Sequence, residues 1–238
     1  MKEYFSPLNT GYIAEYGDNP RTELIDLITE VPEQVFEIGC GSGATGVAIK
    51  QKFPNVKYIG LDSNKKAAQI AQTRLDKVIV SDIEKAQLDA LGLTKEYFDL
   101  IICADVLEHL YDPWKTLFTL RDYLKPNGKV LASIPNIQNI DTIINLLNGS
   151  WTYKKHGILD ATHIRFFTFS GIMKMFSGTG YKMIQCSHAT QSELGRIKKW
   201  PADINFGRIV LRDITRDEAS KLFVFQYYVI AQKISLNN

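Results

Sequence analysis

The chain has 238 residues, which is enough to bury one substantial core around a single sheet. Hydrophobic residues make up 45% of it and charged residues 23%, an ordinary balance that excludes the disordered and fibrous classes. The formal net charge of +2 gives no sign of a polyanionic partner, so no nucleic acid is expected.

Between residues 35 and 136, short apolar runs alternate with segments of helical period. The runs have strand length and are rich in β-branched and aromatic residues; they fall at 35–38, 56–61, 77–80, 98–103 and 129–134. Helical spacing fills 44–53, 64–75 and 112–124, with Pro113 near the start of the last helix and Asn127-Gly128 after its end. The alternation predicts a doubly wound, Rossmann-like α/β sheet of mostly parallel strands.

The pattern changes after residue 136. Helices are predicted at 139–149 and 169–180, followed by strands around 181–189 and 222–233. These two strands would bring the sheet to seven and close one edge as an antiparallel pair. We expect one domain over residues 1–238, with irregular insertions near 149–168 and 190–220 that cover the substrate side.

Cysteine usage and the chain start bear on the compartment. Cys40, Cys103 and Cys186 are far apart and form no CxxC pair, so neither a zinc site nor a disulfide framework is indicated. The opening MKEYFSPLNT lacks the features of a signal peptide, and no run of about 18 apolar residues offers a membrane span. We expect a soluble, cytoplasmic protein.

The stretch FEIGCGSGATG at 36–46 joins the end of the first strand to a helix. Glycines at such a place allow a tight turn and the close approach of a ligand, and the helix start favours a negative group. A phosphate loop is excluded because Val47, and not lysine, follows Gly46. A dinucleotide site stays open, since the GxGxxG pattern is met and Asp62 follows about 20 residues later.

Five motifs in register resemble class I S-adenosylmethionine-dependent methyltransferases. The motifs are ExGxGxG at 37–43, GLDSN at 60–64, VSDIE at 80–84, ADVLEHL at 104–110 and LKPNGKVLASIPN at 124–136. The segments NPRTELIDLI at 19–28 and GILDATHIRFFT at 157–168 are similar to a bacterial branch of that family often linked to cell-surface glycan biosynthesis. The resemblance covers roughly residues 10–185 and implies S-adenosylmethionine as cofactor and S-adenosylhomocysteine as product.

The resemblance also implies which residues hold the cofactor. The glycine stretch would contact the methionine end of the cofactor, and the acid at the end of the second strand would bind the ribose. The pair after the third strand would contact the adenine, and the pair after the fourth strand would line the sulfonium end. These residues are Gly39, Cys40, Gly41, Gly43, Asp62, Ser63, Asp82, Ile83, Ala104 and Asp105. Loop capping is the structural alternative for Asp62 and Asp82. Glu37, a carboxylate in an apolar strand, is expected to brace the glycine turn through backbone N–H groups, or to contact the cofactor's ammonium group indirectly.

We expect the acceptor to be an oxygen of a small molecule or glycan. A hydroxyl acceptor must lose a proton, and His163 is the first candidate for a general base, followed by His109; the alternative for each is a structural hydrogen bond. Arg165 and Arg21 are candidates to bind a carboxylate or phosphate, or else to anchor loops. No metal is expected, because no cluster of histidine and acidic residues is evident.

Two other functions compete with methyl transfer. An NAD(P)-dependent oxidoreductase is favoured by the YxxxK spacing of Tyr111 and Lys115, although Pro113 between them is typical of the first turn of a helix. A protein that binds the cofactor without chemistry would keep the same motifs. The acceptor's identity and the oligomeric state do not follow from the sequence.

Overall fold

The computed structural model describes residues 19–190 and 197–234. Its main sheet has seven strands in the order β3-β2-β1-β4-β5-β9-β6. These strands are β1 (Gln34–Ile38), β2 (Lys57–Asp62), β3 (Lys77–Val80), β4 (Phe98–Ala104), β5 (Leu124–Pro135), β6 (Tyr181–Thr190) and β9 (Val224–Lys233). The first five run parallel, while β9 pairs antiparallel with both β5 and β6. The expected seven-stranded, mostly parallel sheet with an antiparallel edge pair is confirmed.

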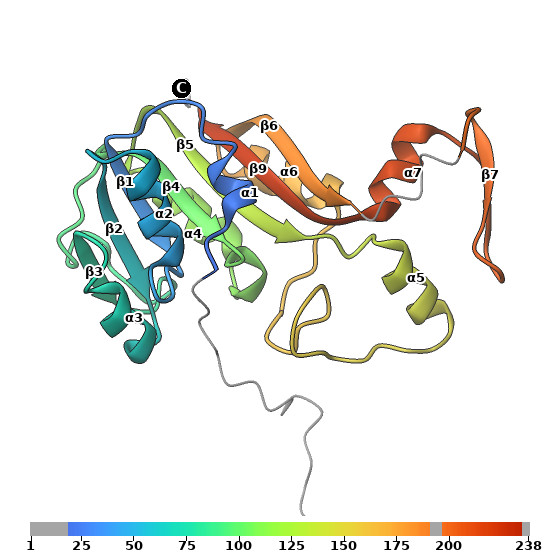
Figure 1. Ribbon diagram of the computed structural model, residues 1–238, viewed down its shortest axis with the longest axis horizontal. Helices are drawn as coiled ribbons and strands as arrows, with labels where there is room; N and C mark the ends of the chain where they lie inside the picture. Colours follow the sequence, from blue (N-terminus) through green and yellow to red (C-terminus); the bar gives the residue numbers. More distant parts are fainter. Residues whose placement is uncertain (1–18, 191–196, 235–238) are drawn as a thin grey trace, which may run out of the picture.

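Helices cover both faces of this sheet (Figure 1). They are α1 (Thr22–Ile25), α2 (Ala44–Lys52), α3 (Lys65–Ala71), the 3-10 helix η1 (Leu107–His109), α4 (Pro113–Leu120), α5 (Ile140–Leu147), α6 (Phe169–Gly178) and α7 (Arg216–Phe223). Side chains of α1, α2 and α3 join one buried cluster, and those of α4 and α6 join the other. Successive residues of one strand divide between them: Leu100 and Ile102 face the first cluster, Ile101 and Cys103 the second. This alternation explains why the central strands are apolar on every residue.

The start of α4 has the capping residue and the proline that the sequence indicated. Asp112 accepts a hydrogen bond from the Lys115 backbone N–H and Pro113 occupies the first turn of α4, where its missing N–H costs nothing. The Asn127-Gly128 pair, however, does not end α4. It lies inside β5, where Asn127 has a φ of +64°, so the pair shapes an irregularity in a strand that begins earlier than predicted.

The region expected as a polar insertion at 190–220 contains regular structure in its described part. A two-stranded sheet forms from β7 (Ala202–Asn205) and β8 (Val210–Ile214), and α7 follows it. Leu222 and Phe223 of α7 pack with Ile140 of α5 in a small separate cluster. In Figure 1, α5, α7 and β7 lie beyond the end of β5, to one side of the main sheet.

The carboxyl ends of the parallel strands form one edge, and the antiparallel β9 brings its first residues to the same edge. Pro135 at the end of β5 pairs with Gln226 of β9. Segment 149–168, which contains neither a helix nor a strand of the sheet, returns to this edge through hydrogen bonds from the Ile164 and Arg165 N–H groups to the Glu108 carbonyl. Within the described residues, no helix is long and apolar enough to span a bilayer.

Candidate functional site

The turn between β1 and α2 depends on its glycines. Gly39, Gly41 and Gly43 have φ values of +68°, +53° and +84°, a region that other residues rarely adopt. A Cβ atom on Gly39 would lie 2.7 Å from Cγ2 of Val106. No side chain of the described residues caps α2 at Gly43, so the start of this helix can offer N–H groups to a ligand.

The buried carboxylate of Asp62, at the end of β2, holds this turn. Its Oδ2 accepts a hydrogen bond from the Gly41 N–H at 2.8 Å, and its Oδ1 accepts one from the Asn64 N–H at 2.7 Å. Both bonds are loop-capping bonds, the structural alternative stated for this residue. Each carboxylate oxygen has a second lone pair, so the capping bonds leave room for ribose hydroxyls.

Glu37 lies in β1 with 2% of its surface exposed. The expectation that it braces the glycine turn through backbone N–H groups is corrected: its carboxyl oxygen Oε2 accepts a hydrogen bond from the Tyr58 hydroxyl at 2.8 Å. Burial, reinforced by the nearby charge of Asp62, raises the pKa of Glu37 to about 8. The carboxyl group is therefore protonated at neutral pH.

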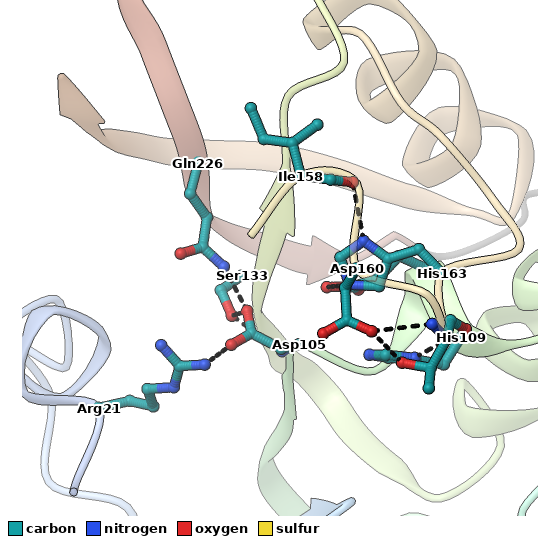
Figure 2. Close-up of polar contacts among 10 residues, drawn as sticks. Arg21, Asp105, His109, Ser133, Ile158, Asp160, His163 and Gln226 are labelled. Atoms are coloured by element: carbon teal, nitrogen blue, oxygen red, sulfur yellow. Dashed lines mark hydrogen bonds and ion pairs between the residues drawn. The ribbon is translucent and has the colours of Figure 1, made fainter. Parts of the chain in front are cut away.

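Asp105 follows β4 and interacts with polar groups of β5, of β9 and of the residue before α1 (Figure 2). Its backbone has a φ of +53°, and its carboxylate accepts hydrogen bonds from Ser133 of β5 and Gln226 of β9. The Arg21 guanidinium forms an ion pair with the same carboxylate. Arg21, predicted as an anion-binding residue, is thus already paired with an acid at this edge of the sheet.

Two histidines and one glutamate meet beside Asp105. The imidazole rings of His109 and His163 are in edge contact, with 4.7 Å between their centroids. His163 Nε2 lies 3.9 Å from Oε1 of Glu108, whose carboxyl group is 1% exposed. In the described part of the chain, neither Glu108 carboxyl oxygen has a hydrogen-bond partner. The expectation that histidine and acidic residues form no cluster is therefore wrong.

Burial governs the protonation of this cluster. It raises the pKa of Glu108 to about 8, although the Arg21 charge acts in the opposite direction. Burial and the neighbouring His163 ring lower the pKa of His109. The Nδ1 atom of His163 lies 3.0 Å from the Ile158 carbonyl oxygen, and that of His109 lies 3.2 Å from the Thr162 carbonyl oxygen, contacts that Figure 2 marks. The structural hydrogen bonds considered for both histidines are thus present.

A cleft of about 950 Å³ connects these groups. Its lining includes Gly39, Cys40 and Gly41 of the glycine turn, Ala104 and Asp105 after β4, Arg21, Glu108, His109 and His163. This volume is at the upper end of the usual range for small-molecule sites. The cleft therefore runs from the glycine turn to the histidine cluster.

The remaining predicted residues lie outside the cleft lining. Gly43, Asp62, Ser63, Asp82, Ile83 and Arg165 are not among the residues that line it. The Asp82 carboxylate is paired with Lys85 and accepts a hydrogen bond from the Glu84 N–H. The Arg165 Nε donates a hydrogen bond to the Tyr111 carbonyl at 3.0 Å, which matches the loop-anchoring alternative.

The fold also decides whether Tyr111 and Lys115 can form the YxxxK pair of a dehydrogenase. Tyr111 precedes α4, while Lys115 lies in its first turn, so the two side chains do not share a helix face.

Sequence reasoning missed Glu108, Ser133 and Gln226 as site residues. Glu108 could have been found, because an acid in the mostly apolar stretch VLEHL resembles Glu37 in its cost of burial. Gln226 carries no local signal. Only the antiparallel pairing of β9 with β5 brings it to this edge.

Residues 36–130 match the family model described as a methyltransferase domain. That span runs from β1 into β5 and contains the glycine turn, Asp62, Asp105 and Glu108. These residues are therefore similar to methyltransferase domains of the S-adenosylmethionine-dependent class. The cofactor of that class is S-adenosylmethionine, and the cleft lined by the glycine turn fits the place where it would bind.

Curated relatives and a solved structure agree with this class. The trans-aconitate 2-methyltransferase of Deinococcus radiodurans is 31% identical over 117 residues, 49% of this chain and 43% of that protein. A ubiquinone biosynthesis O-methyltransferase of Ralstonia nicotianae is 30% identical over 103 residues, 42% of each chain. The matches thus span less than half the length of these two relatives.

The structural likeness extends over most of the chain. A Thermotoga maritima S-adenosylmethionine-dependent methyltransferase, described as a possible histamine N-methyltransferase, has a TM-score of 0.61. The superposition covers 92% of this chain and 90% of that chain at 17% identity, so the likeness concerns the fold alone.

Proposed function

We propose that the chain transfers a methyl group from S-adenosylmethionine to an oxygen atom of a small molecule or glycan in the cytoplasm. One observation carries the proposal: a single cleft joins the glycine turn of the methyltransferase domain to a polar cluster contributed by segment 149–168. A cleft of about 950 Å³ has room for a cofactor and part of an acceptor.

The cofactor's proposed place follows the glycine turn. Gly39 to Gly43 approach its methionine end, and Asp62 accepts hydrogen bonds from the ribose hydroxyls through its free lone pairs. Asp82 and Ile83, at the end of β3, meet the adenine, and Ala104 and Asp105 face the sulfonium end. The strand order β3-β2-β1-β4 supports this order along the edge.

The reaction is an in-line displacement at the methyl carbon. The acceptor oxygen forms a bond to that carbon, the carbon–sulfur bond breaks with its electrons going to sulfur, and the hydroxyl proton leaves. The protein's task is to hold both reactants in line and to help remove the proton. His163 and His109 line the cleft and are the proposed proton acceptors, while Arg21, which also lines it, would orient an anionic acceptor.

The acceptor class rests on two considerations. Residues 157–168 are similar to a bacterial branch associated with glycan biosynthesis, and one curated relative is named as an O-methyltransferase. Segment 149–168 and the described part of 190–220 would cover the acceptor, because the first lines the cleft and the second packs on α5, which also lines it.

A cofactor titration tests the proposal first. S-adenosylhomocysteine should bind to the full chain with saturation in calorimetry, and NADH should give no comparable response. Transfer of labelled methyl from S-adenosylmethionine should then be screened over sugars, phenols and hydroxy acids. Saturable NADH binding without a response to S-adenosylhomocysteine would overturn the proposed function.

A further inference from the structure

We propose that Glu108, His109 and His163 bind a divalent transition-metal cation at the end of the cleft that faces the acceptor. Each of the three residues offers one ligand atom, and these atoms lie within 4.8 Å of one another. Two imidazoles and one carboxylate are the donor set of many catalytic zinc and iron sites. A site of this kind keeps coordination positions open for water or a substrate oxygen.

The two imidazoles are oriented as metal ligands usually are. The Nδ1 atoms of His163 and His109 contact the carbonyl oxygens of Ile158 and Thr162 at 3.0 and 3.2 Å. A carbonyl oxygen can only accept, so each Nδ1 carries the hydrogen and each neutral ring keeps its lone pair on Nε2. A backbone carbonyl on the far nitrogen is the common second partner of a metal-bound histidine.

The buried carboxyl group of Glu108 lies beside the His163 ring at the cleft. It is 1% exposed and lines the cleft, yet neither oxygen has a hydrogen-bond partner in the described part of the chain. A buried carboxyl group without partners is costly to maintain. A cation bound between Glu108 and the two Nε2 atoms would remove that cost.

The backbone holds the three ligands from two directions. Glu108 and His109 are adjacent in η1, directly after β4. His163 comes from the returning segment, which the Ile164 and Arg165 N–H groups fix to the Glu108 carbonyl at 3.0 Å each. The site thus lies where segment 149–168 contacts the sheet edge, and metal binding would stabilise that segment in its position.

Metal binding would require the three ligand atoms to move slightly closer together. His163 Nε2 and Glu108 Oε1 are 3.9 Å apart, whereas ligand atoms around a tetrahedral zinc ion are separated by about 3.4 Å at bonds near 2.1 Å. Rotations of the three side chains over at most about 1.5 Å bring the 4.8 Å span into that range. The nearby Asp160 carboxylate, which also lines the cleft, adds negative charge that favours a cation.

The role of the metal rests on the proposed function. A cation held by these three residues would lower the pKa of the acceptor's hydroxyl group, which would release its proton to water in the cleft before its oxygen attacks the methyl carbon. His109 and His163 would then act as ligands in place of proton acceptors. Metal binding itself needs neither cofactor nor acceptor, so it can be tested separately.

The experiment titrates Zn²⁺ alone into the chelator-treated full chain by calorimetry. We expect one tight site per chain and binding at least about 100-fold tighter than that of Mg²⁺, which prefers oxygen ligands. Glu108→Gln and His163→Gln should each weaken the site by about 100-fold or more. His188→Gln, which alters an exposed histidine of β6, is the matched control and should leave the site unchanged.

Two further readouts guard against misfolded variants. Circular dichroism checks each variant, and Co²⁺ added to the unaltered protein should give visible bands typical of nitrogen and oxygen ligands. Absence of saturable Zn²⁺ binding in the unaltered protein, or equal binding in folded Glu108→Gln and His163→Gln, overturns the metal site. If the unaltered protein binds Zn²⁺ but does not bind S-adenosylhomocysteine, that result would instead count against the proposed function.

Discussion

The Tyr58 hydroxyl donates a hydrogen bond to the Glu37 carboxyl group across the β1–β2 pair, with 2.8 Å between the two oxygens. Both side chains are fully or almost fully buried. The pair thus places an ionisable group inside the sheet, directly before the glycine turn, where the hydroxyl groups of Tyr58 and Thr45 interact with it.

Glu37 makes folding stability depend on pH. Burial raises its pKa from the ordinary 4.5 to about 8, with Tyr58, Cys40 and Asp62 as its titratable neighbours. Between these two values the native state holds a proton that the unfolded state has lost. The free energy of unfolding therefore falls as pH rises through this window.

Glu37→Gln should remove this part of the pH dependence. The amide keeps an oxygen for the Tyr58 hydroxyl but cannot ionise, so the variant should match the unaltered protein near pH 4.5 and exceed its stability near pH 8.5. Urea unfolding at the two pH values measures the difference. Other groups with raised pKa values are the same in both proteins, so parallel pH profiles would show that Glu37 ionises normally.

Asp62→Ala should reduce cofactor affinity. The change removes the acceptor for the Gly41 and Asn64 N–H groups, which loosens the glycine turn, and it removes the proposed ribose contact. We expect at least a 10-fold loss of S-adenosylhomocysteine affinity in calorimetry and a loss of stability of about 1–3 kcal/mol. Asp203→Ala, at an exposed position of β7, is the control; unchanged affinity in folded Asp62→Ala would contradict the assignment.

The sheet and the glycine turn were readable from the sequence because their signals are local. Strands covered on both faces must be apolar on successive residues, and a left-handed turn such as Gly39 to Gly43 strongly favours glycine. The β7–β8 hairpin was missed because it lacks such a local signal. It packs on a small cluster with α5 and α7, and its strands ADIN and VLRDI carry no long apolar run.

The histidine–glutamate cluster could not be predicted because its members are joined only by folding. Glu108 and His163 are 55 positions apart, and no periodicity relates them. Contact arises because the N–H groups of Ile164 and Arg165 bind the Glu108 carbonyl, a backbone bond with no sequence signature. Arg165 was noticed for its charge, but its guanidinium anchors the loop at Tyr111.

His163→Gln should impair turnover without affecting the cofactor. The ring lies at the histidine cluster and not on the glycine turn, so S-adenosylhomocysteine affinity should stay within about twofold. Turnover, measured with an acceptor found in the screen, should fall by roughly 100-fold, the scale for a lost base or metal ligand. Unaltered turnover in His163→Gln, alongside unaltered turnover in the His188→Gln control, would assign His163 a purely structural role.

Two glycine-to-alanine changes in helices should have opposite effects on stability. A Cβ on Gly46 of α2 would lie 2.4 Å from Leu75 Cδ2 and 2.8 Å from Tyr58 Cε1, so α2 would have to shift away from β2. We expect Gly46→Ala to lower the free energy of unfolding by about 1–3 kcal/mol, the usual cost of overpacking. A Cβ on Gly178, the last residue of α6, meets nothing within 4 Å. Gly178→Ala should therefore raise stability by about 0.5–1 kcal/mol by restricting the unfolded chain. Urea unfolding of both variants and the unaltered protein measures these differences. A Gly46→Ala variant as stable as the unaltered protein would show that α2 adjusts without cost.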